Sequence, residues 1–97
     1  KEKKFSEALK SFNFACESGD GESCYMMGKI YERQGRMKSA LKMHKYACDK
    51  KNMPRSCLVV GKDFQKNKAE DKKAVRYYLK KACEGAIEEG CFLLEKR

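Results

Sequence analysis

The stretch Ala15-Cys16-Glu17-Ser18-Gly19-Asp20-Gly21-Glu22-Ser23-Cys24 decides the fold of this chain. Its two cysteines stand eight positions apart, and a Gly-Asp-Gly break lies between them. In an unbroken helix their Cα atoms would lie roughly 12 Å apart, whereas a disulfide requires about 4.4–6.8 Å. A turn at 19–21 instead brings the end of one helix to the start of the next. The stretch therefore predicts a helical hairpin with a disulfide beside its turn.

This arrangement occurs three times along the chain. Three cysteines end the first helices of the expected hairpins and three begin the second helices: Cys16, Cys48 and Cys83, then Cys24, Cys57 and Cys91. The first set is spaced by 32 and 35 residues, and the second set by 33 and 34. Each cysteine of the first set follows an alanine, and two of the second set are followed by glycine and then by an aromatic residue: Gly28 and Tyr31, Gly61 and Phe64. Such a period predicts repeated two-helix units, in which these small and aromatic residues pack between helices.

Apolar residues recur at intervals of three or four positions, which is the spacing of one helix face. We expect helices at 2–18, 22–34, 37–50, 54–67, 70–84 and from about 87 to 94. Glycine or proline stands at most of the breaks, and Pro54 suits the first turn of the helix that it opens. The fold class that follows is all-α.

The period, the two-helix unit and the Ala-Cys ending resemble Sel1-like repeats, which are relatives of the tetratricopeptide repeats, and in particular their cysteine-rich branch. The segment Lys73-Ala74-Val75-Arg76-Tyr77-Tyr78-Leu79-Lys80-Lys81-Ala82-Cys83 is most similar to the first-helix motif of that family. It has one residue more between alanine and cysteine than the two preceding units. The usual Gly-x-Gly loop is reduced to Gly35 and to 67–69, and Glu95 stands where the first two units have glycine.

The resemblance implies a right-handed α/α solenoid of three helix-turn-helix repeats, each joined by one disulfide. A single repeat domain would span 1–97, with repeats at about 2–35, 36–68 and 69–97, the last of them truncated. The chain begins at Lys1, so we expect a mature or trimmed product or a segment of a longer protein.

The cysteines favour disulfides over the other uses of thiols. Six cysteines allow fifteen connectivities, and only local pairing uses the hairpin geometry, which predicts Cys16–Cys24, Cys48–Cys57 and Cys83–Cys91. Structural zinc ligands usually lie about two to four residues apart, closer than these pairs, so no metal site is expected. Buried free thiols are the remaining alternative. An even number of cysteines in a short chain favours an oxidising compartment.

The formal net charge of +9 raises the question of an anionic partner. The lysines are spread over every expected helix among carboxylates, a pattern more typical of solvated faces than of a phosphate-binding track. We therefore do not expect nucleic acid as the partner, and favour an acidic protein surface or an anionic membrane surface. No apolar run approaches the ~20 residues that span a membrane, and no signal-peptide pattern opens the chain.

The sequence offers no recognisable catalytic constellation and no phosphate loop. The only histidine, His44, has no nucleophile at a familiar spacing, and the repeat places it in a packing position equivalent to Phe12 and Tyr78. The serines stand outside Ser-x-x-Lys and Gly-x-Ser-x-Gly contexts. We expect a protein that is not an enzyme and that uses no cofactor.

The resemblance implies a protein–protein interaction scaffold, because the first helices of such repeats line an extended concave surface. By position, Asn13, Lys45 and Lys80 are the candidate partner-binding residues. One context implied by the family is the mitochondrial intermembrane space, where a member assembles cytochrome c oxidase; this predicts an accessory subunit or assembly factor of a respiratory complex.

Two alternatives come from the same resemblance and from the thiols. The first is a secreted or periplasmic bacterial protein like the Helicobacter cysteine-rich proteins, with peptide or penicillin binding and weak β-lactamase-like activity, although no acylation site is visible. The second is a redox carrier that uses one cysteine pair, for which Lys50 and Lys51 beside Cys48 are weak support.

Overall fold

Six α-helices make up the regular structure of residues 2–95, which this computed structural model describes. They are α1 (Glu2–Glu17), α2 (Gly21–Arg33), α3 (Met37–Lys51), α4 (Pro54–Asn67), α5 (Lys72–Glu84) and α6 (Glu88–Glu95). No strand occurs within those residues, so the all-α prediction is confirmed. The expected helix boundaries agree with the observed ones to within two residues.

Local hydrogen bonds fix the starts of two helices. The Asp20 side chain caps α2 by accepting a hydrogen bond of 3.2 Å from the Glu22 backbone N–H, and it also accepts one of 2.6 Å from Ser23 Oγ. Asp71 caps α5 in the same way, by accepting from the Ala74 backbone N–H at 3.2 Å. The helix therefore starts at Lys72, two residues later than apolar periodicity predicts, because a capping residue lies outside the helix that it caps.

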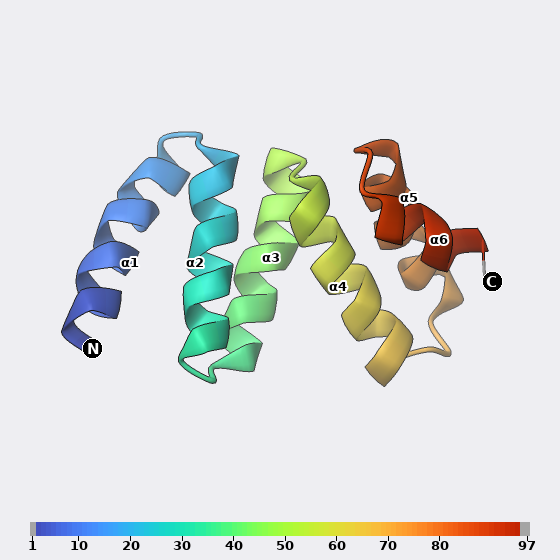
Figure 1. The fold of residues 1–97 in the computed structure, drawn as a ribbon, viewed down its shortest axis with the longest axis horizontal. Helices are drawn as coiled ribbons and strands as arrows, with labels where there is room; N and C mark the ends of the chain where they lie inside the picture. Colours follow the sequence, from blue (N-terminus) through green and yellow to red (C-terminus); the bar gives the residue numbers. More distant parts are fainter. Residues whose placement is uncertain (1, 96–97) are drawn as a thin grey trace.

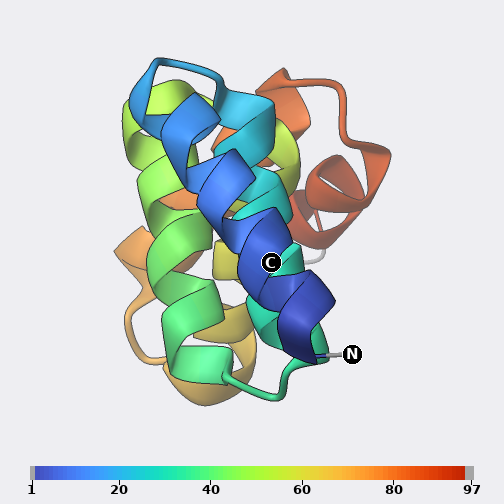
Figure 2. The same cartoon turned by 90° about the vertical axis from the view of Figure 1, so that its left-hand side faces the viewer.

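The helices lie side by side in chain order along the longest dimension of the molecule (Figure 1). Each one packs mainly against its neighbours in the chain, and the extents are 42 × 25 × 19 Å. Figure 2, a view from the α1 end, shows α1 lying across the helices behind it. Two surface ion pairs link the second helices of successive hairpins: Arg55 to Glu22 at 2.8 Å, and Lys62 to Glu89 at 2.6 Å.

Each of the three disulfides joins the two helices of one hairpin beside its turn. The pairs are Cys16–Cys24, Cys48–Cys57 and Cys83–Cys91, with Cα–Cα distances of 4.9, 4.8 and 4.5 Å. This is the local pairing expected from the sequence, and residues 2–95 contain no free cysteine. From the disulfide end the helices of a hairpin diverge, as α3 and α4 do in Figure 1. The α3–α4 hairpin is therefore a wedge that is closed at its disulfide end and open at the other end.

The core is continuous from one hairpin to the next. One cluster combines the first disulfide and Met27 with Ala47 of α3, and the next combines the second disulfide and Val60 with Tyr78 and Ala82 of α5. The disulfide sulfurs are thus part of the apolar packing. The cores of the first two hairpins are therefore completed by the first helix of the hairpin that follows.

Glycines on the second helices allow this close approach. The His44 ring lies over Gly28, with ring atoms 2.6–2.8 Å from the position that a Cβ would occupy there. Leu79 lies over Gly61 in the same manner, with its Cδ2 2.8 Å from such a position. Leu79, rather than Tyr78, is therefore the equivalent of His44, which corrects the alignment expected from the sequence. The extra residue of the third unit lies before Leu79. Leu79 is therefore four residues before Cys83, just as His44 is four residues before Cys48.

Candidate functional site

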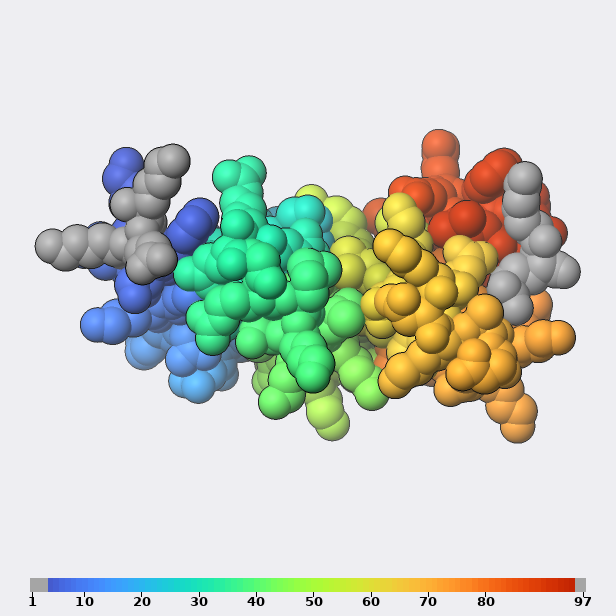
Figure 3. Space-filling view, turned by 90° about the horizontal axis from the view of Figure 1, so that it is seen from below, coloured from blue at the N-terminus to red at the C-terminus, as the bar shows by residue number. Residues whose placement is uncertain are grey.

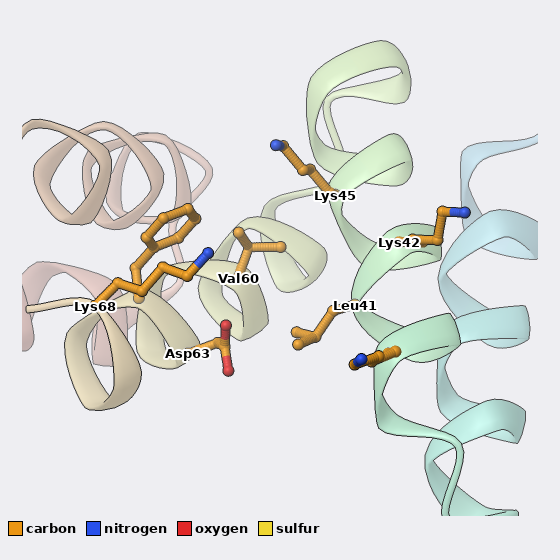
Figure 4. Close-up of a pocket in the computed structure, with 8 residues that line it drawn as sticks. Leu41, Lys42, Lys45, Val60, Asp63 and Lys68 are labelled. Carbon is orange, nitrogen blue, oxygen red and sulfur yellow. The ribbon is translucent and has the colours of Figure 1, made fainter. Parts of the chain in front are cut away.

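The open side of the α3–α4 wedge contains the candidate binding site, a groove with an apolar floor. A cavity of about 370 Å³ lies there, lined by Lys38, Leu41, Lys42, Lys45, Val60, Asp63, Phe64 and Lys68. Figure 4 shows Leu41 pointing from α3 toward α4, and Val60 between Lys45 and Lys68. Val60 is only 3% exposed, so the floor is recessed below the rim. We call this feature the basic groove.

Four lysines surround the floor of the basic groove. Among the side chains of residues 4–95, no carboxylate oxygen lies within 4 Å of the amine of Lys38, Lys42, Lys45 or Lys68. The Lys68 amine lies over the Phe64 ring, 5.7 Å from its centroid, a cation–π contact that holds this lysine at the rim. The groove therefore has four lysine amines, none of them in an ion pair with another described side chain, beside apolar surface.

Asp63 is the one carboxylate of the lining, and it is already engaged. Its Oδ1 accepts a hydrogen bond of 2.7 Å from Asn67 Nδ2, one turn later on α4. Its charge lies on the α4 side, across the groove from Lys38 and Lys45. One carboxylate against four amines leaves the lining with a net positive charge.

A second groove adjoins the first on the side of α1. It has a volume of about 440 Å³ and is lined by Asn13, Cys16, Glu17, Lys42, Met43 and Tyr46. Lys42 is common to both grooves, and Figure 4 shows it directed away from Val60, toward the first hairpin. The recessed surface therefore continues from α1 across α3 to α4. Figure 3 shows the neighbouring edge of the molecule, where the α2–α3 and α4–α5 connections (green and gold) form separate groups.

The three predicted partner-binding residues are all exposed, but the structure does not bring all of them together. Lys45 lines the basic groove and Asn13 lines the groove beside it. Lys80 lies on α5 and lines neither groove. The basic groove also contains three lysines that were not predicted from the sequence: Lys38, Lys42 and Lys68. Their only signal in the sequence is their spacing around Leu41 and Phe64.

The single histidine is the centre of a buried polar network. His44 and Ser56 are both 0% exposed. The His44 Nε2 lies 2.8 Å from Glu32 Oε2, and its Nδ1 lies 3.2 Å from Ser56 Oγ. Because a carboxylate can only accept, Nε2–H donates to Glu32 and Nδ1 accepts from the Ser56 hydroxyl. Burial lowers the pKa of His44, and its hydrogen bond with Glu32 opposes this shift.

This Ser–His–Glu chain resembles the relay of a hydrolase in its connections but not in its access. A nucleophilic serine must reach a substrate carbonyl, and Ser56 is fully enclosed between α3 and α4. The network instead ties three helices together, since Glu32 is on α2, His44 on α3 and Ser56 on α4. Its role in this structure is to fix the joint between the first two hairpins.

The three disulfides differ in their exposure. Cys16, Cys24, Cys48 and Cys57 are buried, whereas Cys83 and Cys91 are partly exposed. Thiol–disulfide exchange requires access to a sulfur atom, so Lys50 and Lys51 do not make Cys48 reactive in this structure. The buried Cys48–Cys57 pair therefore gives no support to the redox-carrier alternative.

Across residues 2–95 no helix has both the length and the apolar character needed to cross a membrane. The same residues contain no group of three or more His, Cys, Asp or Glu side chains suited to a metal ion.

No family model, no curated protein and no solved structure matches the chain, so the resemblance to Sel1-like repeats rests on its sequence pattern.

Proposed function

We propose that this chain is a non-enzymatic protein–protein interaction scaffold, built as an α/α solenoid of three Sel1-like repeats. The observation that carries the proposal is the basic groove, in which four lysines without carboxylate partners surround an apolar floor. Burial of an apolar side chain gives affinity, and unpaired rim charges select and steer a partner. The walls of the groove, α3 and α4, are joined by the Cys48–Cys57 disulfide and pack in clusters that include the neighbouring hairpins, which supports a fixed binding surface.

The compartment of this scaffold follows in part from its cysteines. Three disulfides indicate an oxidising compartment. We propose the mitochondrial intermembrane space, with a role as an accessory subunit or assembly factor of a respiratory complex. A secreted or periplasmic bacterial protein is the alternative. Fractionation of the native source with a non-reducing peptide map tests this: oxidised protein in the intermembrane-space fraction supports the proposal, and six free thiols contradict it.

Site-specific photo-crosslinking tests the binding role. A photoreactive residue is placed at Asn13, Lys45 or Lys80, and at Glu88 on α6 as the control position. We expect protein adducts from the positions at the grooves, Asn13 and Lys45, and none from Glu88. Absence of adducts at all three first-helix positions, with the protein folded and in its own compartment, would contradict a scaffold that binds through this surface.

A further inference from the structure

We infer that the basic groove binds an acidic peptide segment that inserts one apolar side chain between α3 and α4. This inference rests on the proposed scaffold function and names the class of its partner. The occupant follows from the two parts of the groove, which are the recessed floor and the lysines around it.

The floor requires an occupant that reaches inward. Leu41 and Phe64 are half-buried and Val60 is 3% exposed, and together they form the apolar part of a cavity of about 370 Å³. A side chain of leucine or phenylalanine size fits a recess of this kind, where burial of its apolar surface would favour binding. A flat bilayer surface cannot contact a floor that lies below its rim. The concave shape therefore favours a peptide over a membrane.

The rim requires several negative charges rather than one. Lys38 and Lys45 are seven residues apart on α3, which corresponds to about 10 Å along the helix axis. Lys68 lies at the other wall, where it is held over Phe64. A single small anion cannot neutralise amines that are this far apart, whereas carboxylates on both sides of an apolar residue can. The partner is therefore an acidic segment with an apolar residue near its centre.

Lys42 extends the same chemistry toward the first hairpin. It lines both grooves, so a segment that is anchored in the basic groove can continue over Met43 toward Asn13. The Asn13 Nδ2 donates to Glu17 Oε2 at 3.5 Å, and the Asn13 carbonyl oxygen can accept a hydrogen bond from the peptide backbone there. The segment would therefore run from α4 across α3 toward α1, with its acidic residues beside the lysines of the basic groove and uncharged residues beside Glu17.

Direct binding of synthetic peptides to the purified, oxidised chain tests the inference. The probe is a short fluorescent peptide of glutamates and serines with one central phenylalanine. Two control peptides replace the phenylalanine by alanine or the glutamates by lysines. We expect saturable binding of the probe, about tenfold weaker binding of the alanine peptide, and none of the lysine peptide. Equal binding of the phenylalanine and alanine peptides would overturn the inference.

A matched pair of variants distinguishes binding at the groove from a general attraction of the acidic peptide to the positively charged protein. Lys38→Glu/Lys45→Glu reverses two charges in the groove, and Lys10→Glu/Lys72→Glu reverses two exposed charges outside it. Both variants have the same net charge. We expect the first to weaken probe binding by about tenfold or more and the second to change it less than about twofold. An equal loss of probe affinity in the two variants would show that binding depends on net charge alone, and this would overturn the inference.

Further measurements distinguish a failure of this inference from a failure of the proposed scaffold function. Leu41→Ala should reduce the advantage of the phenylalanine peptide over the alanine peptide while circular dichroism shows an unchanged helical fold. Anionic phosphatidylserine vesicles serve as the other probe, and binding to vesicles but to no peptide would overturn the inference in favour of a lipid surface. If Asn13 or Lys80 gives cross-links but no peptide binds, the scaffold function would still be supported, and only the inference of an acidic peptide in the basic groove would be overturned.

Discussion

Ala86 has a backbone conformation that its side chain disfavours. Its φ is +69°, and it follows the C-cap of α5 at Gly85. The corresponding position in the first hairpin, three residues after the cysteine, is occupied by Gly19 with φ +112°. Left-handed backbone costs an L-residue about 1–2 kcal/mol, whereas glycine adopts it freely. The turn of the third hairpin therefore contains a strain that the first avoids.

Ala86→Gly should raise the free energy of unfolding by about 0.5–1 kcal/mol, since the relief of strain exceeds the entropy that glycine adds to the unfolded chain. Urea denaturation measures this change. Ala74→Gly, inside α5, is the control and should lower the stability by about 1 kcal/mol. A loss of stability at both positions would contradict the strain at Ala86.

Gly28 is required by the ring that lies over it. A methyl group there would lie 2.6 Å from two atoms of the His44 ring, so Gly28→Ala should destabilise the protein by about 1–3 kcal/mol. The substitution is expected to be partly rescued by His44→Ala, because the smaller side chain removes the clash. A double-mutant cycle by urea denaturation measures the coupling, which should be at least about 0.5 kcal/mol. Additive effects would show that the two residues do not meet.

The buried histidine makes stability depend on pH. Because the pKa of His44 is lower in the folded protein than its usual 6.5, the folded state binds this proton less readily than the unfolded chain. The contribution of His44 is therefore complete above pH 6.5 and is lost as the pH falls below 6.5 toward the folded pKa. Lys29 and Glu32 on α2 are the charged groups that face it.

The free energy of unfolding should accordingly fall between pH 7.5 and 5.5. In the variant His44→Leu/Ser56→Ala the free energy of unfolding should depend less on pH in this range, because the titrating histidine is replaced by an apolar side chain. Leu79 already occupies the equivalent position between the second and third hairpins. Urea denaturation at several pH values makes the comparison. An identical slope in the two proteins would assign the pH dependence to other groups.

Among the helical elements, the hairpins were the part that the sequence could predict well. The Gly-Asp-Gly break, Pro54 and the cysteine spacing are local signals, and the helices and their disulfides followed from them. The groove depends instead on how far α3 and α4 diverge from their disulfide, and both helices also pack against others, α3 against α2 and α4 against α5. No local pattern contains that information, so Lys38 and Lys68 could not be assigned to one site from the sequence.

A single disulfide contributes a large share of the stability of a hairpin. Cys48–Cys57 closes a loop of about ten residues, worth roughly 2.5–3 kcal/mol in the chain-entropy model. Cys48→Ser/Cys57→Ser should lose at least this amount, because it also buries two hydroxyl groups in the core. Urea denaturation of the variant measures the loss, with Ser6→Ala as an exposed control.

Exposure predicts the order in which the disulfides are reduced. Cys83–Cys91 is partly exposed and joins the shortest helix, so limiting reductant should open it before the two buried bridges. Alkylation followed by peptide mapping reads the order directly. Earlier labelling of Cys16 or Cys48 would contradict the burial of those bridges.

At the scale of the whole molecule, contacts run almost entirely between neighbouring helices. The inner helices α2 to α5 are each packed on both sides, whereas α1 and α6 are packed mainly on one. Amide exchange should therefore be slower in α2 to α5 than in α1 and α6. Hydrogen exchange with mass spectrometry on the oxidised chain tests this gradient, and uniform protection would indicate one cooperative unit.

The locality of the disulfides has a consequence for how the protein is made. Each bridge joins cysteines only eight or nine positions apart, and none links one hairpin to another. A chain that enters its compartment from one end can oxidise each hairpin as soon as that hairpin emerges, before the next cysteine pair arrives. The correct partner is then the nearest thiol, and short loops close fastest. Maturation therefore needs an oxidant and little reshuffling of mispaired bridges.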